Sequence, residues 1–299
     1  MIPSPFTKLT LFFSALFSLL VIGLIYVFSI VDDRTKVVFC DVGQGDAAYI
    51  RINNQTDILI DSGPDDKVLS CLGKHMPFYD RKIELAILSH PQKDHYGGFL
   101  QLIDRYQISR LIIPLVDNNA DQQFIRLKQK LTTNKIPLSI LKAGDLINMK
   151  NAKLFFFWPT KNFLNTSLVF DKPRLVNNVV LGASGLDSNY FSSVFSLQID
   201  NFRLLFTGDA PGQVLNRLPE KNKLKTTVLK IPHHGSKNGL TKKFLLLADP
   251  TVTVINVGKN NSYGHPSKEV LDMLKAMNIK IRRTDLEGDI VFKINSNFK

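Results

Sequence analysis

A short apolar run followed by a cluster of histidine and aspartate restricts most strongly how this chain can fold. The run Leu85–Leu88 is typical of a buried strand, and the loop after it holds His90, Asp94, His95 and a Gly-Gly pair. Imidazole and carboxylate bind divalent metals, and a loop at a strand end can bring several of them to one point. A solvated polar loop is the simpler alternative, but the spacing His-x-x-x-Asp-His directly after a strand favours a metal site.

An uncharged N-terminal stretch predicts a membrane-spanning helix. Residues Leu9–Val31 carry no charge and are long enough, as a helix, to cross a hydrocarbon core of about 30 Å. No Ala-x-Ala-like cleavage site follows, so we expect an uncleaved anchor rather than a signal peptide. We therefore predict two parts, with residues 1–36 as anchor and linker and residues 37–299 as one folded domain.

The charges around this stretch bear on its orientation. Lys8 and the amino terminus precede it, and two acidic and two basic residues follow within 32–36. The positive-inside rule then favours a cytoplasmic N-terminus. We expect a single-pass protein of the cell membrane with its domain extracytoplasmic. Cys40 and Cys71 allow either a disulfide or buried thiols, so they do not decide the compartment.

The overall charge points to the class of partner. The formal net charge is +12, of which the apolar N-terminal segment contributes only Lys8. Such a balance favours polyanions, namely nucleic acid, anionic lipid or anionic wall polymer. The lysines are dispersed along the chain, so solubility alone is an equally good explanation.

Five more motifs follow predicted strands or turns. They are Phe39–Ala47 (FCDVGQGDA), Leu59–Gly63 (LIDSG), Phe206–Asp209 (FTGD), Pro232–Lys237 (PHHGSK) and Asn261–Pro266 (NSYGHP). With the histidine loop, and in this order, they resemble the hydrolase domain of the ComEC family of DNA-uptake proteins, within the metallo-β-lactamase superfamily. The resemblance implies an α/β fold, an αββα sandwich, here preceded by one transmembrane helix. Alternating strands and helices along the chain favour the same layers.

The resemblance also implies a metal centre. Its candidate ligands are His90, Asp94, His95, Asp209, His233 and His234. Four groups complete one ion's site, namely Asp94, His95, Asp209 and one histidine of the pair, and Asp209 can bridge two ions. Adjacent residues on an extended segment point in opposite directions, so we expect one of His233 and His234 to reach the metal. Which one does so is left open.

Two departures from the superfamily pattern weaken one of the two ion positions. Gln92 stands where the signature has a histidine, and no histidine occurs between His95 and His233. ComEC-like domains often share these gaps. The weakened position would keep His90, the amide oxygen of Gln92, Asp209 and water, an oxygen-rich set that suits Mn²⁺ better than a second tightly held Zn²⁺. We expect one or two divalent ions, Zn or Mn, and no small-molecule cofactor.

Other polar residues of the motifs have candidate roles. The candidate catalytic residues are Asp94, His234 and His265. His265 could complete the metal site or act as a general acid, or it simply enters a helix before Pro266. Asp41 and Asp46 either support the metal site from outside or cap turns, with neither favoured. Asp61 matches an aspartate that is usually structural in the superfamily.

The pattern elsewhere predicts ordinary helices and one long loop. Residues 122–134 carry apolar side chains at helical spacing, and 242–248 and 268–277 are expected to be helices as well. Residues 160–190 are the least patterned, and their Asn, Ser and Gly content predicts a long loop.

The expected function is that of a membrane-anchored, metal-dependent hydrolase that cleaves phosphodiesters, with DNA or other nucleic acid as substrate. One alternative is hydrolysis of a cell-envelope phosphodiester, such as phosphorylcholine on teichoic acid. Another is a polyanion-binding module that kept the fold and lost turnover, which Gln92 would suit. A β-lactamase is less favoured because those enzymes rely on ligands that this chain lacks. With one span expected, a transport channel is not predicted, and the oligomeric state is left open.

Overall fold

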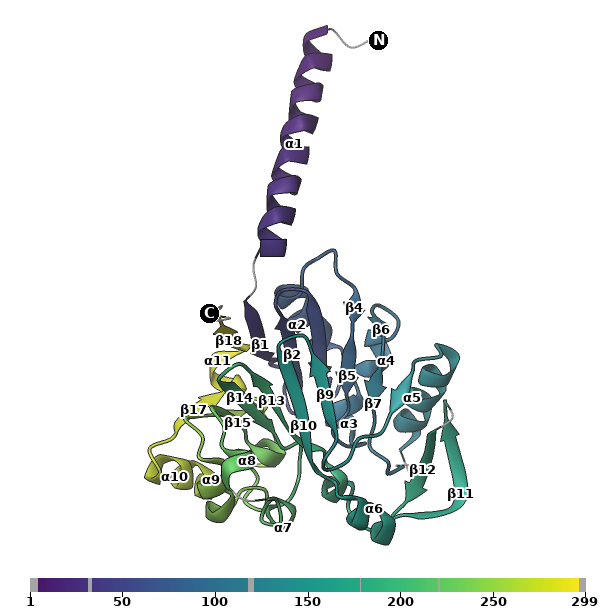
Figure 1. Cartoon of the computed structure of the whole chain (residues 1–299), viewed down its shortest axis with the longest axis vertical. Helices are drawn as coiled ribbons and strands as arrows, with labels where there is room; N and C mark the ends of the chain where they lie inside the picture. Colours follow the sequence, from purple (N-terminus) through teal and green to yellow (C-terminus); the bar gives the residue numbers. More distant parts are fainter. Residues whose placement is uncertain (1–4, 32–33, 118–120, 178, 220, 296–299) are drawn as a thin grey trace.

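The computed structural model describes residues 5–31, 34–117, 121–177, 179–219 and 221–295. Helix α1 (Pro5–Val31) stands clear of a two-sheet domain (Figure 1). Within the described ranges it is the single helix long and apolar enough to cross a membrane. The predicted N-terminal helix is therefore confirmed, whereas Asp32 and Asp33, used above to orient it, lie outside the described residues.

Two seven-stranded sheets form the centre of the domain. The first has the order β18-β1-β2-β3-β5-β7-β8 and the second β17-β16-β15-β14-β13-β10-β9. Strands of the first sheet are β1 (Thr35–Phe39), β2 (Ala48–Ile52), β3 (Thr56–Ile60), β5 (Leu85–Ile87), β7 (Leu111–Ile112), β8 (Leu138–Ser139) and β18 (Ile290–Ile294). Strands of the second are β9 (Leu146–Met149), β10 (Ala152–Trp158), β13 (Val194–Ile199), β14 (Phe202–Phe206), β15 (Val228–Lys230), β16 (Val252–Ile255) and β17 (Lys280–Arg283).

The alternation of side chains along each strand builds two apolar layers at once. In β1, Val37 and Phe39 point between the sheets, where Phe39 stacks on Phe206 of β14. Val38 and Cys40 point the other way, toward the helices. Because successive side chains leave a strand on opposite faces, a strand buried on both faces is apolar throughout.

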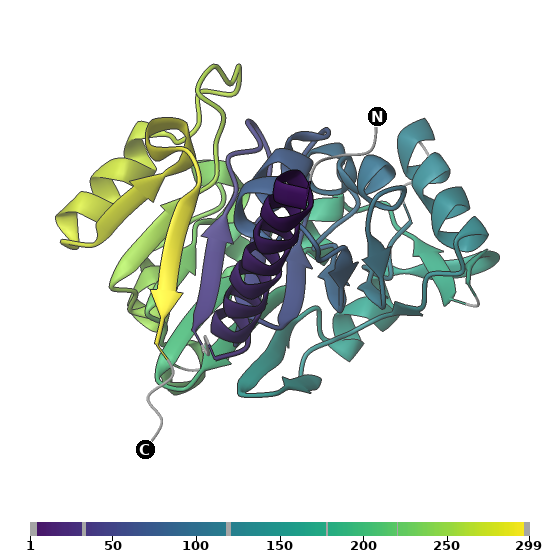
Figure 2. The ribbon, with the colours of Figure 1, turned by 90° about the horizontal axis from the view of Figure 1, so that it is seen from above.

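Helices cover the outer face of each sheet, so the predicted αββα order is confirmed. The first sheet packs against α2 (Lys67–His75), α3 (Lys93–Tyr96), α4 (Phe99–Leu102) and α5 (Gln122–Thr133). The second packs against α7 (Gly212–Leu215), α8 (Lys221–Leu224), α9 (Lys242–Ala248) and α10 (Lys268–Ala276). Seen from the end where α1 emerges, α10 (yellow) and α5 (blue-teal) lie on opposite flanks (Figure 2).

The prediction of a long loop at residues 160–190 is wrong. This segment contains α6 (Lys161–Ser167), the hairpin β11 (Val169–Val176) and β12 (Val179–Ala183), and a 3₁₀ turn η1 (Ser188–Phe191). Thr160 caps α6 by accepting a hydrogen bond from the Phe163 amide at 3.1 Å. Leu164 and Phe191 are buried in a small apolar cluster of their own. The polar residues thus cap and turn the chain, while a few apolar ones anchor it.

Cys40 and Cys71 form a disulfide, with their Cα atoms 5.8 Å apart. It joins the end of β1 to α2, and both residues are buried. The bond therefore fixes one side of the loop 41–47, which carries Asp46.

The parallel strands of the two sheets determine where the histidine and aspartate motifs lie. β3, β5 and β7 run parallel in the first sheet, and β14, β15 and β16 in the second. Their carboxyl ends lie at one end of the domain, opposite the end at which α1 joins β1 (Figure 1). The histidine and aspartate motifs follow these strand ends, where loops of a rigid sheet carry functional groups.

Candidate metal centre

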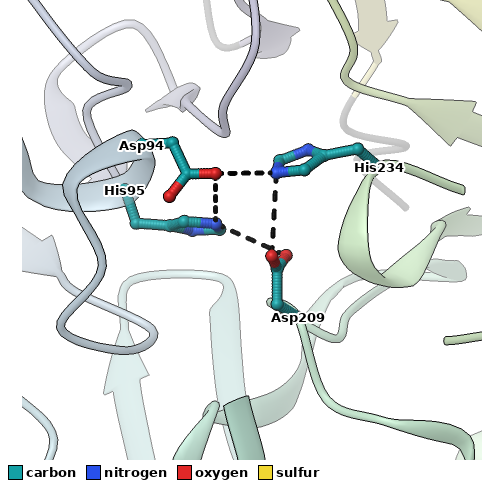
Figure 3. A group of neighbouring side chains, drawn as sticks. All are labelled: Asp94, His95, Asp209 and His234. Carbon is teal, nitrogen blue, oxygen red and sulfur yellow. Dashed lines mark hydrogen bonds and ion pairs between the residues drawn. The ribbon is translucent and has the colours of Figure 1, made fainter. Parts of the chain in front are cut away.

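Four ligand-type side chains from both halves of the chain converge at this end. We call Asp94, His95, Asp209 and His234 the four-ligand cluster (Figure 3). His234 Nε2 lies 3.2 Å from Asp94 Oδ2 and 3.6 Å from Asp209 Oδ2. His95 Nε2 lies 3.4 Å from Asp209 Oδ1. One ligand atom from each of the four lies within 4.8 Å of the others, so a single ion could contact all of them.

Short turns at strand ends deliver these side chains. Asp94 and His95 lie in α3, which follows β5, and His234 lies in the 3₁₀ turn η2 (Pro232–Gly235) after β15. Asp209 follows β14 through Gly208, whose φ is +48°. A Cβ on Gly208 would lie 3.0 Å from the Ser89 Cβ, so glycine allows the two turns to approach closely.

A carboxylate below His95 fixes the orientation of its ring. Asp61 Oδ2 lies 2.9 Å from His95 Nδ1, and the same carboxylate accepts from the Ser89 amide at 2.7 Å. An ionised carboxylate only accepts, so His95 Nδ1 carries the proton and Nε2 faces Asp209. Asp61 therefore has the supporting position expected of it, and it orients His95 as outer carboxylates orient metal-binding histidines.

A backbone carbonyl does the same for His234. Its Nδ1 lies 2.9 Å from the carbonyl oxygen of Asn256, which follows β16. A carbonyl only accepts, so Nδ1 is protonated and Nε2 is directed at Asp94 and Asp209. The Asn256 side chain donates in turn to the Ala47 carbonyl at 3.3 Å, which ties this support to the first sheet.

Several buried polar atoms of the site lack hydrogen-bond partners. They are His90 Nε2, His95 Nε2, both carboxylate oxygens of Asp209 and Asp46 Oδ1. Buried polar atoms in proteins are nearly always paired, so a group of orphans needs an explanation. A divalent cation contacting the His95 and Asp209 atoms would satisfy them, and a set of two imidazoles and two carboxylates fits Zn²⁺ or Mn²⁺.

Neighbouring charges perturb every ionisable group of the cluster. Burial alone would lower the pKa of His234, but Asp209 and Asp46 raise it to about 10. Carboxylates likewise outweigh burial and raise the pKa of His95. Burial would raise the pKa of Asp209, yet His234 and His95 hold it well below its usual range. The cluster therefore favours uptake of positive charge, as protons or as metal.

A second group of candidates lies close to the four-ligand cluster. We call His90, Gln92 and His233 the second group. His90 Nε2 and His233 Nε2 lie 4.0 and 3.8 Å from Asp209 Oδ2. Burial and His95 lower the pKa of His90 to about 3, which keeps it neutral as a ligand must be. Gln92 donates its amide to Ser188 Oγ at 3.0 Å.

The backbone at the histidine pair differs from the extended segment that was expected. His233 and His234 have φ of 49° and 52°, in the left-handed region. Both rings therefore turn toward Asp209 instead of pointing in opposite directions. His234 is the buried member that belongs to the four-ligand cluster, and His233 is partly exposed.

Lys230 and Asp46 support the centre, a role that the sequence does not indicate for Lys230 and leaves open for Asp46. Lys230, at the end of β15, is buried and forms an ion pair with Asp46; its Nζ also lies 3.7 Å from Asp209 Oδ1. Asp46 Oδ1 lies 3.3 Å from His234 Nδ1, so Asp46 supports the centre from below. A lysine inside the apolar run Val228–Ile231 is the sequence signal that could have indicated this pair.

An open cleft of about 410 Å³ leads to the cluster. Asp94 and His234 lie on its wall, with Lys93, Tyr263 and His265 around them. Tyr263 is 70% exposed, and its ring lies parallel to that of His265, with centroids 6.0 Å apart. His265 thus lies in the cleft outside the four-ligand cluster, 5.8 Å from the His233 ring.

Comparison with known proteins finds relatives in sequence but no matching family model. No family model matches the chain. ComE operon protein 3 of Bacillus subtilis is 26% identical over 296 residues, covering 91% of this chain and 35% of that protein. Competence protein ComA of Neisseria gonorrhoeae is 26% identical over 271 residues, covering 87% and 32%. The chain thus spans about a third of the length of these relatives.

Solved structures agree on the fold. The metallo-β-lactamase fold protein YhfI from Bacillus subtilis superposes with a TM-score of 0.55 at 13% identity, covering 88% of this chain and all of that one. This chain has the metallo-β-lactamase fold and resembles the ComEC-type competence proteins. Zn²⁺-bound PqqB from Methylobacterium extorquens superposes with a TM-score of 0.50 at 10% identity, covering 86% of this chain and 99% of that one. Fold and ligand cluster together identify a candidate metal centre in a metallo-β-lactamase fold.

Proposed function

We propose that this protein is a membrane-anchored, metal-dependent phosphodiesterase that cleaves nucleic acid. The observation that carries the proposal is the four-ligand cluster. Ligand atoms of His95 and Asp209 are buried without hydrogen-bond partners, and the other two members, Asp94 and His234, line an open cleft. Asp94, His95, Asp209 and His234 would hold one divalent ion. His90 and His233, with Asp209 as a shared carboxylate, would hold a second, weaker one.

The chemistry divides between the ion and the protein. A bound divalent cation supplies Lewis acidity and lowers the pKa of water toward neutrality. His265 supplies proton transfer: burial and His233 lower its pKa, so at neutral pH its imidazole is free to accept a proton from an attacking water. The same proton can then pass to the leaving oxygen. Asp94 and His234 would act on the reacting groups through the ion that they hold at the cleft wall.

Features of the cleft favour a nucleic acid over a small ester. The exposed ring of Tyr263 offers a stacking surface, and base stacking on an aromatic side chain is worth about 1–3 kcal/mol per base. Lys93, Lys237 and Lys259 are exposed on the loops that carry the motifs and can contact phosphates. The relatives named as competence proteins are consistent with a DNA substrate.

The test is DNA binding and cleavage by the full chain in detergent. The Asp209→Asn variant should bind single-stranded DNA with a slope of about −0.7 in log K against log salt for each phosphate contacted, or about −0.9 on duplex. The native protein with Zn²⁺ or Mn²⁺ should cleave DNA and bis-p-nitrophenyl phosphate. Salt-independent behaviour without DNA binding would overturn the nucleic-acid proposal and favour the envelope phosphodiester instead.

A matched pair of tyrosine variants sharpens this test. Tyr263→Ala should weaken single-stranded DNA binding about 5- to 150-fold, the equivalent of one lost stacking contact. Tyr79→Ala removes an exposed tyrosine that does not line the cleft, and it should leave DNA binding unchanged. Equal effects of both variants would remove Tyr263 from the binding surface.

The disulfide supports an extracytoplasmic domain, as proposed from the charges around α1. Disulfides persist in oxidising compartments and are rare in the cytosol, and the Cys40–Cys71 bond is buried within the first half of the domain. An alkaline phosphatase fused after Lys299 should therefore be active. An inactive phosphatase together with an active cytoplasmic reporter at the same position would reverse the orientation.

A further inference from the structure

The loop between α2 and β4 (Lys82–Ile83) presents two neighbouring aromatic side chains to solvent. Phe78 is 84% exposed and Tyr79 is 54% exposed, and their rings meet edge to face with centroids 5.4 Å apart. The turn that carries them is closed by a hydrogen bond from the Asp80 amide to the Pro77 carbonyl at 2.9 Å. An ordered turn that displays two aromatic rings suggests contact with another surface.

Two contacts hold this turn beside the start of the first sheet. Lys36 Nζ, in β1, donates to the His75 carbonyl at the end of α2. Arg51, paired with Lys36 across β1 and β2, contacts Asp80 Oδ2 at 3.0 Å. The aromatic pair is therefore held at the end of the domain where β1 begins, whatever the exact direction of α1.

The membrane anchor ends close to the same point. Helix α1 ends at Val31 and β1 begins at Thr35. Four residue steps of extended chain reach about 14 Å at most, so the start of β1 lies that close to the end of the helix. In Figure 1 the loop from α2 to β4 rises at the end of the domain that faces α1.

We propose that Phe78 and Tyr79 form a second membrane contact, with their rings in the headgroup layer of the bilayer that α1 spans. Aromatic side chains favour this layer because their rings are apolar while their edges tolerate water. Lys74 and Lys82 flank the turn and are exposed, so they can meet anionic headgroups. A bilayer is the occupant because the anchor holds it permanently within reach, at high effective concentration. This inference rests on the proposed anchoring by α1.

Two contacts with the bilayer would fix where the cleft points. The four-ligand cluster lies at the carboxyl ends of the parallel strands, and the aromatic turn lies at the opposite end of the first sheet. The five residues of β1 alone separate these ends by about 17 Å. The cleft would therefore open away from the membrane, toward a polymer in solution and not toward lipid headgroups of the same leaflet.

Tryptophan fluorescence in vesicles tests this contact. The chain has one tryptophan, Trp158, which is buried and gives a constant background. The full-length Phe78→Trp variant is reconstituted into vesicles that contain lipids brominated near the headgroup. We expect a blue-shifted emission and at least twofold stronger quenching than for the native chain.

Two control variants separate failure of this contact from failure of the anchor. Leu246→Trp places the probe on α9, at the far end of the domain in Figure 1, with the native side chain 54% exposed like Tyr79. It should not be quenched. Leu16→Trp, inside α1, should be quenched by lipids brominated deep in the acyl chains if the helix spans the bilayer. Quenching of the Leu16→Trp variant without quenching of Phe78→Trp would overturn the aromatic contact alone. Equal quenching of Phe78→Trp and Leu246→Trp would do the same. No quenching of Leu16→Trp would overturn the anchor.

Discussion

Two buried charged clusters at opposite ends of the first sheet differ in how completely they are paired. Near the end at which α1 joins the domain, Tyr49, Arg51 and Asp57 form what we call the paired cluster. The Tyr49 hydroxyl donates to Asp57 at 2.6 Å, and Arg51 donates to Asp57 and Asp80. Each of these side chains has a partner within the protein.

The four-ligand cluster at the other end is buried except for Asp94, which is partly exposed, and ligand atoms of His95 and Asp209 have no hydrogen-bond partner. Both clusters combine carboxylates with basic side chains inside the domain, so burial and charge alone do not distinguish them. The difference lies in hydrogen bonding. Each side chain of the paired cluster has a partner, so removing one would leave a buried charge uncompensated, whereas the four-ligand cluster has ligand atoms left for a cation. Each prediction below tests that distinction, from the largest expected effect to the smallest.

Asp209→Asn should abolish hydrolysis while leaving the protein folded. Loss of the shared carboxylate removes metal, and with it several kcal/mol of transition-state stabilisation, or on the order of 10³-fold in turnover. Bound metal and turnover of bis-p-nitrophenyl phosphate measure the loss. Asp249→Asn, at an exposed carboxylate on the end of α9, is the matched control and should retain both. Full turnover by the Asp209 variant would exclude it from the catalytic centre.

Arg51→Ala should do the reverse, by destabilising the fold without changing the chemistry. Removing one partner of a buried ion pair costs about 3–5 kcal/mol because the other charge is left uncompensated. Urea unfolding of the full chain in detergent measures this, beside Arg105→Ala, an exposed arginine expected to change stability by less than about 0.5 kcal/mol. Similar stability of the two variants would show that the paired cluster is not structural.

The paired cluster should also give stability a pH dependence that Asp57→Asn removes. Burial raises the pKa of Asp57 to about 6, although Tyr49 and Arg51 stabilise its charge. The folded state then binds more protons than the unfolded state between about pH 4 and 6, so this contribution is complete below that window and is lost as the pH rises through it. The loss is about 3 kcal/mol at most, at 1.36 kcal/mol per pKa unit. The free energy of unfolding of the native chain and of the Asp57→Asn variant is compared across this window. An equal pH dependence of the two, or a native stability that rises with pH relative to the variant, would contradict the assignment.

Asp61→Asn should weaken the metal centre without destroying it. The amide cannot accept from His95 Nδ1 and from both Ser89 groups as the carboxylate does. Loss of such an outer partner lowers metal affinity or activity about 10- to 100-fold. Competition with a fluorescent chelator measures the affinity. An effect as large as that of Asp209→Asn would mean that Asp61 itself binds metal.

Gln92→Ala should have the smallest effect and lower turnover by less than about tenfold. An amide oxygen is a weak ligand, and the Gln92 side chain already donates a hydrogen bond to Ser188. Metal counting should show that the variant keeps the ion of the four-ligand cluster. If the second group holds a weaker second ion, His233→Ala should lower the count by one at most. Loss of all metal from either variant would show that the four-ligand cluster and the second group form a single site.

Much of this architecture could be predicted because its signals are local. The run Leu85–Leu88 and the helix at 242–248 follow from the periodicity of their own side chains, and α9 has the predicted bounds. Ligand chemistry is local too, since His95 and Asp209 carry their donor atoms wherever the chain places them. The six motifs were therefore enough to predict the αββα layers and to nominate the ligands.

The contacts at the site that the sequence did not predict depend on packing between distant segments. Asp94 and His234 are 140 residues apart in sequence and meet because the two sheets stack face to face. The pairing of Lys230 with Asp46, and the left-handed turn that brings both His233 and His234 toward Asp209, depend on contacts between those sheets. A residue's chemistry belongs to its own side chain, but whether a buried charge finds a partner or is left to bind a cation depends on what the rest of the fold places within about 3 Å of it.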